Sequence, residues 1–110
     1  MQALVAVVNQ AVVGLATYYD IYSSFLGKPG LWLDDLFVAD NFRKRGIGKA
    51  LLSALCASAH ARGCARVDWL VATDNHPGRA FYASLGATVF ETVRHARLAE
   101  RDIERLAASV

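Results

Sequence analysis

Four basic residues and two glycines stand close together in the segment from Arg43 to Lys49. A turn that contains Gly46 and Gly48 can bring backbone N–H groups close to an anion, because neither residue carries a Cβ atom. The apolar spacing after the turn predicts a helix over Ala50–Ala61, and the first N–H groups of a helix lack partners within it. These features together predict a site for a pyrophosphate group.

The spacing of the glycines excludes two common phosphate-binding loops. No Gly-Lys-Ser/Thr sequence closes the turn, so it is not the loop of nucleoside triphosphatases. Leu51 stands where the dinucleotide-binding fingerprint has its third glycine. Two interpretations remain: a site for the pyrophosphate of an acyl-coenzyme A, or a turn that only starts a helix and whose basic side chains, Lys49 included, are solvated.

Apolar runs and turn residues indicate the elements that must hold this turn. Asn9-Gln10 is a hairpin signal, because Asn tolerates a positive φ, and Gly63 and Gly86 are typical of helix ends. The expected strands are Ala3–Val8, Ala11–Tyr19, Leu31–Val38 and Ala65–Val71. The later chain is expected to form a short helix over Gly78–Leu85, a closing hairpin from Thr88–Val93 and His95–Leu98, and a terminal helix over Glu100–Ala108.

Length and composition bound the class of the protein. With 110 residues, of which 55% are apolar, the chain is expected to form one domain over residues 1–110. A net charge of +2 argues against non-specific nucleic-acid binding, and no apolar run is long enough to predict a membrane span. The N-terminus carries no signal-peptide pattern, so a reduced, cytoplasmic location is expected.

Cysteines and histidines are too scattered to predict a metal centre. Cys56 and Cys64 fit no metal-ligand spacing, and His60, His76 and His95 fall on different elements. We expect no metal cofactor, and we expect Cys56 to be a small buried residue of the helix.

The pattern Arg43-x-x-Gly46-x-Gly48 resembles the signature of the GCN5-related N-acetyltransferase (GNAT) superfamily. Two further blocks match that superfamily in order and spacing: Asn75 after the fourth strand, and the segment 79–87 with Tyr82 and Leu85-Gly86-Ala87. The resemblance covers about Ala3 to about Leu98. Leu33–Val38 and Gly14–Tyr19 look most like the diamine and polyamine acetyltransferase branch. The resemblance implies an α/β (α+β) fold, with a mixed, mostly antiparallel twisted sheet flanked by helices.

The resemblance also implies an activity and a cofactor site. The activity is transfer of an acetyl group from acetyl-CoA to a primary amine of a small molecule, diamine- or polyamine-like. By the family pattern, the backbone of Leu36, Phe37 and Val38 bonds the pantetheine arm. The pyrophosphate would contact the turn formed by Arg43, Lys44, Arg45, Gly46, Ile47, Gly48 and Lys49. Asn75 would bond the pantetheine or order a helix start, and Arg79 would either touch the phosphates or stay solvated.

Tyr82 is the candidate acid for the leaving thiolate. A phenol has an unperturbed pKa of about 10, so it is protonated at neutral pH and can donate its proton to the thiolate. The alternative for Tyr82 is a structural aromatic residue on a short helix, beside Phe81.

Asp34 and Asp35 interrupt an otherwise apolar strand, and such violations often mark sites. Because adjacent strand residues point to opposite faces, only one of them is expected to face a cleft. There it could attract a cationic amine and accept its proton. By the family pattern Asp34 stands at a substrate-contacting position, commonly Glu. Trp69 and Tyr19 could wall the acceptor site, although core packing explains both equally well.

Members of the superfamily usually begin with a strand and two helices that precede the segment where this chain opens. The family comparison therefore predicts an N-terminally truncated form, in which the edge of Ala3–Val8 is uncovered. An uncovered apolar edge favours pairing with another chain, so we expect a homodimer. The alternative function is a non-catalytic module that binds acyl-CoA or assembles with a partner and lacks a complete acceptor site.

Overall fold

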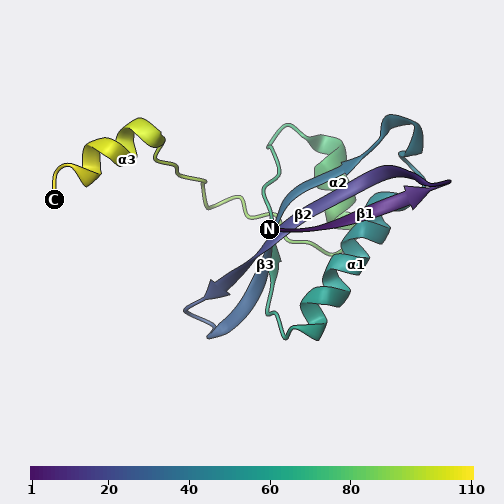
Figure 1. The fold of residues 1–110 in the computed structure, drawn as a ribbon, viewed down its shortest axis with the longest axis horizontal. Coiled ribbons are helices and arrows are strands. Elements are labelled where there is room, and N and C mark those ends of the chain that lie inside the picture. The colour runs from purple at the N-terminus through teal and green to yellow at the C-terminus, as the bar shows by residue number, and fades with distance from the viewer. The chain divides into compact units, whose positions relative to one another are not determined.

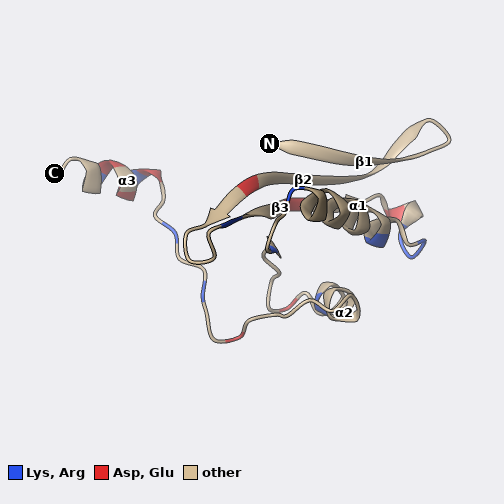
Figure 2. Ribbon diagram, turned by 90° about the horizontal axis from the view of Figure 1, so that it is seen from below, with Lys and Arg blue, Asp and Glu red and all other residues tan.

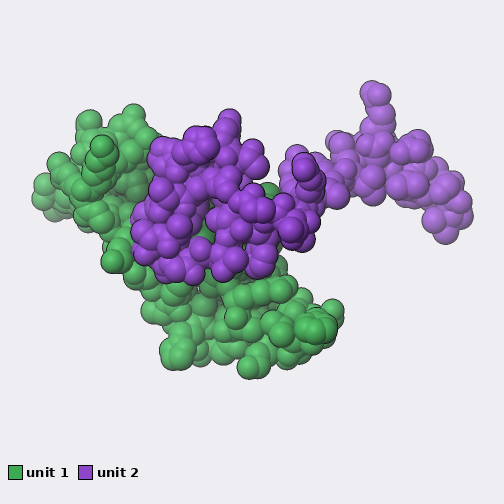
Figure 3. All heavy atoms as spheres, turned by 180° about the vertical axis from the view of Figure 1, so that it is seen from behind, with its two compact units in different colours: residues 1–70 green, residues 71–110 purple.

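Residues 1–110 are described by a computed structural model and divide into two units, Met1–Leu70 and Val71–Val110 (Figure 3). The first unit contains all the strands and the longest helix, and the second contains two short helices. No helix in the chain is both long enough and apolar enough to span a membrane.

The first unit is built on a four-stranded sheet in the order β1-β2-β3-β4. Figure 1 labels its three long strands, β1, β2 and β3. β1 (Gln2–Val8), β2 (Ala11–Ser23) and β3 (Lys28–Val38) pair antiparallel, and β4 (Val67–Asp68) pairs parallel with β3. Asn9 and Gln10 both have positive φ, 50° and 69°, as a two-residue hairpin turn requires. The predicted mixed, mostly antiparallel sheet with flanking helices is confirmed.

The core lies between this sheet and α1 (Ile47–Ala61), which covers one face of it (Figure 2). A 3₁₀ turn, η1 (Asp40–Phe42), connects β3 to the segment before α1. The helix buries a stripe at helical spacing, and the sheet buries alternate residues of β2 and β3. The buried hydrophobic residues are Val13, Ala16, Tyr18, Leu31, Leu33, Leu51, Leu52, Leu55 and Ala59. Cys56 is exposed rather than buried, because it falls one position after Leu55 and off the stripe.

Gly14 sets how closely α1 approaches the sheet. A Cβ atom at Gly14 would lie 3.1 Å from Ile47 Cγ2, 3.1 Å from Leu51 Cδ1 and 3.2 Å from Ala6 Cβ. The first turns of α1 therefore rest directly on the backbone of β2. Any larger residue at position 14 would push the helix start away from the sheet.

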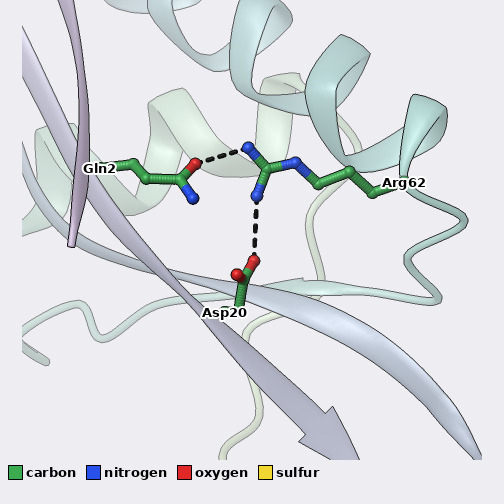
Figure 4. Close-up of polar contacts among 3 residues, drawn as sticks. All are labelled: Gln2, Asp20 and Arg62. Carbon is green, nitrogen blue, oxygen red and sulfur yellow. Dashed lines mark hydrogen bonds and ion pairs between the residues drawn. The ribbon is translucent and has the colours of Figure 1, made fainter.

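Arg62 fastens the other end of α1 to the sheet (Figure 4). Its guanidinium donates to Asp20 Oδ1 at 3.0 Å and to Gln2 Oε1 at 2.5 Å, and it lies over the ring of Tyr18. The contacts join α1 to both β1 and β2 at the end of the sheet opposite the η1 segment. Because these polar groups are largely exposed, their contacts add little to the stability of the fold, and their main effect is to align α1 with the sheet.

Several boundaries differ from the prediction. β2 ends later than predicted, at Ser23, and β3 begins earlier, at Lys28. Ser23 stabilises the turn between them, because its side chain accepts the Leu26 N–H and its carbonyl accepts the Gly27 N–H. α1 starts at Ile47 instead of Ala50. β4 is only two residues long instead of seven, because only Leu31 and Trp32 of β3 pair with it.

The second unit contains α2 (His76–Ser84) and α3 (Glu100–Ala107). The predicted closing hairpin of Thr88–Val93 and His95–Leu98 is wrong, since no strand forms there. Phe90, Val93 and Leu98 are exposed. An isolated two-stranded hairpin is only marginally stable in water, and the predicted hairpin would have had no third strand or buried face to stabilise it.

Candidate functional site

The turn before α1 presents a run of backbone donors. The first bond of α1 is Ala50 N–H to the carbonyl of Gly46, and Arg43 N–H is bonded to Asp40. Between them, the N–H groups of six consecutive residues have no hydrogen-bond partner: Lys44, Arg45, Gly46, Ile47, Gly48 and Lys49. This arrangement suits an anion with several oxygen atoms, because donors and the positive end of the helix dipole coincide.

Two residues of the turn have left-handed backbone conformations. Gly46, the N-cap of α1, has φ of 79°, and Lys44 has φ of 63°. Such a conformation is easy for glycine and costs about 1 kcal/mol or more for a residue with a Cβ atom. Alternation of left-handed and ordinary residues curls successive N–H groups toward one side, which is the geometry of an anion-binding nest.

The basic side chains of the turn divide into two groups. Arg43 and Arg45 are engaged within the protein: Arg43 Nε donates to the Val38 carbonyl at 3.1 Å and its guanidinium pairs with Asp40, while Arg45 lies 4.9 Å from the Phe42 ring centroid. Lys44 and Lys49 are exposed and have no ion pair. Positive charge is concentrated on this turn (Figure 2), and the two lysines are its free cations.

β3 has an open edge next to this turn. β4 pairs only with Leu31 and Trp32, so the remainder of β3 has a strand neighbour on the β2 side alone. Asp35 N–H and Ala39 N–H both point to β2, where they bond Thr17 Oγ1 and the Val13 carbonyl. Because strand residues alternate, Leu36 and Val38 direct their backbone groups to the open edge, whereas Phe37 directs its own to β2.

The three residues predicted to bond a pantetheine arm therefore differ in what they can offer. Leu36 presents a backbone N–H and a carbonyl, and Val38 presents an N–H, since its carbonyl already accepts from Arg43. Phe37 presents its side chain, which is 55% exposed. An extended ligand could pair with this edge in the manner of an added strand.

A β-bulge lies at Asp34. Thr17 pairs with Asp35 and the next residue, Tyr18, pairs with Leu33, so Asp34 is the extra residue on β3. The bulge breaks the alternation on which the sequence-based expectation depended, and both Asp34 and Asp35 are exposed. The Asp35 side chain is bonded to Thr17, whereas the Asp34 side chain has no hydrogen bond or ion pair.

The two aromatic residues predicted to wall an acceptor site lie in the same unit. Tyr19 is an exposed residue of β2, paired with Trp32 of β3. Trp69 is half-buried and directly follows β4. Neither contributes to the buried core.

Asn75 and Arg79 organise α2 in the second unit. Asn75 is the N-cap of α2, and its Oδ1 accepts the Gly78 N–H at 3.1 Å. This is the helix-ordering alternative of the sequence analysis. Arg79 donates to the Thr73 carbonyl at 3.0 Å and pairs with Glu91, so it ties together the segments on either side of α2.

Tyr82 is half-buried on α2, with its ring 5.4 Å from that of Phe81. Burial raises the pKa of the Tyr82 phenol above its ordinary value of 10.0. The side chain thus keeps its proton throughout the neutral range, as a proton donor must. The helix closes as predicted at Leu85-Gly86-Ala87, where Gly86 has φ of 91° and Ala87 N–H bonds the Tyr82 carbonyl.

Comparison with known proteins settles the family. The profile of the Acetyltransferase (GNAT) family matches residues 1–87. This chain belongs to the GNAT family. Among its curated relatives, an L-ornithine N5-acetyltransferase of Arabidopsis thaliana is 38% identical over 87 residues, which are 79% of this chain and 38% of the relative.

The names of the relatives specify more than one acyl group, because a feruloyltransferase is among them. A tyramine N-feruloyltransferase of Nicotiana tabacum is 29% identical over 96 residues, 87% of this GNAT chain and 42% of the relative. The chain thus spans about 40% of the length of these two curated relatives.

A solved structure has the same fold as this chain. It is an integron cassette protein from the mobile metagenome of V. cholerae, with a TM-score of 0.87 and 30% identity, and the match covers 96% of this chain and 65% of that one.

Two residues of this GNAT chain were missed by the sequence analysis. Gly14, below the start of α1, and Thr17, beside the bulge, were not expected to be site residues. A glycine in a strand can mark a close backbone approach, and that signal could have indicated Gly14. A threonine in a strand is ordinary, so nothing in the sequence distinguishes Thr17.

Proposed function

We propose that this chain binds acetyl-CoA and transfers its acetyl group to a primary amine of a small molecule. The observation that carries the proposal is the run of six unpaired N–H groups from Lys44 to Lys49 at the start of α1. A diphosphate suits this run, because it offers several acceptor oxygens and multiple negative charge.

The open edge of β3 supports the same cofactor. A pantetheine arm carries amide groups, which can pair with the free backbone groups of Leu36 and Val38. The exposed Lys44 and Lys49 are available to additional phosphate oxygens. Cofactor binding in the proposal thus uses the open part of β3 and the turn that follows it, two neighbouring parts of the first unit.

The reaction needs two proton transfers. The amine nitrogen attacks the thioester carbonyl, a C–N bond forms, and the C–S bond breaks to release the thiolate of coenzyme A. In the proposal Asp34 accepts the proton that the amine loses, directly or through water, and Tyr82 donates a proton to the thiolate. A phenol that keeps its proton in the neutral range suits the second role.

Charge and the names of the relatives support the proposed acceptor class. The two exposed carboxylates at the bulge, Asp34 and Asp35, favour a cationic acceptor. The names of the relatives specify ornithine and tyramine, both small molecules with a primary amine. We propose a diamine- or polyamine-like amine for this chain.

The test is amine-dependent acyl transfer. The protein is incubated with acetyl-CoA and each of L-ornithine, 1,4-diaminobutane, spermidine and tyramine, and both thiol release and the acetylated amine are measured. The proposal predicts thiol release above the amine-free rate, with a matching acetylated product. Binding of acetyl-CoA without transfer to any amine would instead favour a non-catalytic acyl-CoA-binding module.

A further inference from the structure

Thr17 makes two hydrogen bonds to Asp35 across the β2–β3 ladder. Its Oγ1 accepts the Asp35 N–H at 3.0 Å, and its hydroxyl donates to Asp35 Oδ2 at 3.2 Å. In a regular antiparallel ladder this N–H would bond a backbone carbonyl of the facing strand. The Thr17 hydroxyl gives this N–H a side-chain acceptor directly beside the bulge at Asp34.

The two hydrogen bonds make the neighbouring carboxylates unequal. Asp35 is held against β2 by the threonine that faces it, and one of its oxygens is occupied. Asp34 is exposed, and its side chain has no hydrogen bond or ion pair. Of the two, Asp34 is the carboxylate whose oxygens are all available to a cation.

Packing alone does not require a hydroxyl at position 17. Valine has nearly the same shape as threonine and suits a strand as well. Valine would nevertheless remove the hydroxyl that accepts the Asp35 N–H and release the Asp35 side chain. The bulge would then lose the two bonds that fix its position, and bulges are features that re-aim side chains.

We infer that Thr17 is a positioning residue for the amine acceptor: it fixes the bulge through Asp35 and so leaves Asp34 as the carboxylate that receives a cationic primary amine. The inference rests on the proposed function for the identity of the acceptor. Its test measures amine binding directly and does not require turnover.

The probe is 1,4-diaminobutane, titrated against the protein in the presence of coenzyme A while the backbone amide signals of Asp34 and Asp35 are followed by NMR. In Thr17→Val we expect faster hydrogen exchange at the Asp35 amide and a Kd for the diamine raised about fivefold, the size of one or two lost hydrogen bonds. The Kd for coenzyme A should not change. Thr17→Ser keeps the hydroxyl and should restore both properties.

Two further variants complete the design. Asp34→Asn should weaken diamine binding more than Asp35→Asn does, because Asp34 is the direct ligand. Thr88→Val removes an exposed threonine that makes no side-chain hydrogen bond, and it should change neither measurement.

The outcomes separate this inference from the proposed function. If Thr17→Val binds the diamine as tightly as the wild type does, the inference is overturned, even if the Asp35 amide exchanges faster. An equal loss of diamine affinity in Thr17→Val and Thr17→Ser overturns it as well. Wild-type protein that fails to bind the diamine at the bulge overturns it as well. Wild-type protein that binds the diamine but transfers no acetyl group contradicts the proposed function and leaves the role of Thr17 supported.

Discussion

At the scale of single residues, Tyr82 carries the proposed proton transfer to the leaving thiolate. Tyr82→Phe removes one oxygen atom and keeps the aromatic contact with Phe81. We expect kcat to fall by about 10² or more, as for loss of a general acid, with little change in the Kd for acetyl-CoA. Steady-state kinetics and calorimetry on the same preparation measure both. Equal turnover in the variant would remove Tyr82 from the mechanism.

The pKa of Tyr82 gives a second expectation, on pH. Burial raises this pKa above 10.0 in the folded protein, whereas the unfolded chain has the ordinary value. The unfolded state then loses the proton first as pH rises, so this contribution to stability is complete below about pH 10 and is lost as pH passes the folded pKa. A difference titration of tyrosinate absorbance, wild type minus Tyr82→Phe, should show a midpoint above 10. A midpoint below it would contradict the assignment.

The sequence identified most residues of the proposed site but not how they are arranged. Asp34 and Asp35 could be noticed because two charges interrupt an apolar strand. That Asp34 is the extra residue of a bulge, and that Thr17 occupies Asp35, depends on the register between β2 and β3. Register is a property of two strands together, so the spacing within one strand does not reveal it.

At the scale of elements, Gly14 determines where the start of α1 lies. In Gly14→Ala the added methyl group would meet Ile47, Leu51 and Ala6 within 3.2 Å, so the helix start must shift. We expect a loss of about 1–3 kcal/mol in stability from overpacking. We also expect a Kd for acetyl-CoA raised about tenfold, because the N–H groups of the turn move with the helix.

Gly30→Ala is the matched control for this substitution. A Cβ atom there would lie 3.1 Å from the Arg66 carbonyl and 3.3 Å from Ile21 Cγ1, toward the other end of β3. It should lower the melting temperature to a similar degree and leave the Kd for acetyl-CoA unchanged. A similar loss of affinity in both variants would show that stability, and not the position of α1, governs binding.

Elements whose boundaries are specified by residues close in the sequence were predicted well, whereas elements that depend on pairing with a distant strand were not. The Asn9-Gln10 hairpin, the buried stripe of α1 and the glycine-closed end of α2 are each specified by nearby residues. The segment Thr88–Val93 has strand-like residues but finds no partner strand, and β4 stops after two pairs with β3. Pairing of that kind cannot be read from local sequence.

At the scale of the whole molecule, β1 is an edge strand with one neighbour, β2. Val5 and Val7 of β1 are 54% and 57% exposed. An apolar edge of this kind favours pairing with another chain, and we expect a homodimer that buries it. Sedimentation should show a dimer for the wild type and a monomer for Val5→Lys, which places a charge on this strand. A wild type that stays monomeric at high concentration would contradict the expectation.

The central claim is that the turn before α1 binds the pyrophosphate of acetyl-CoA, and calorimetry tests it most directly. Gly46→Glu places a carboxylate where the diphosphate should lie, at a residue with φ of 79°. Gly27→Glu is its control, since Gly27 also has a positive φ and open space around it but lies in the β2–β3 turn. We predict that wild type and Gly27→Glu bind acetyl-CoA equally and that Gly46→Glu does not bind it. A folded wild type without affinity, or a Gly46→Glu variant with wild-type affinity, would contradict the claim.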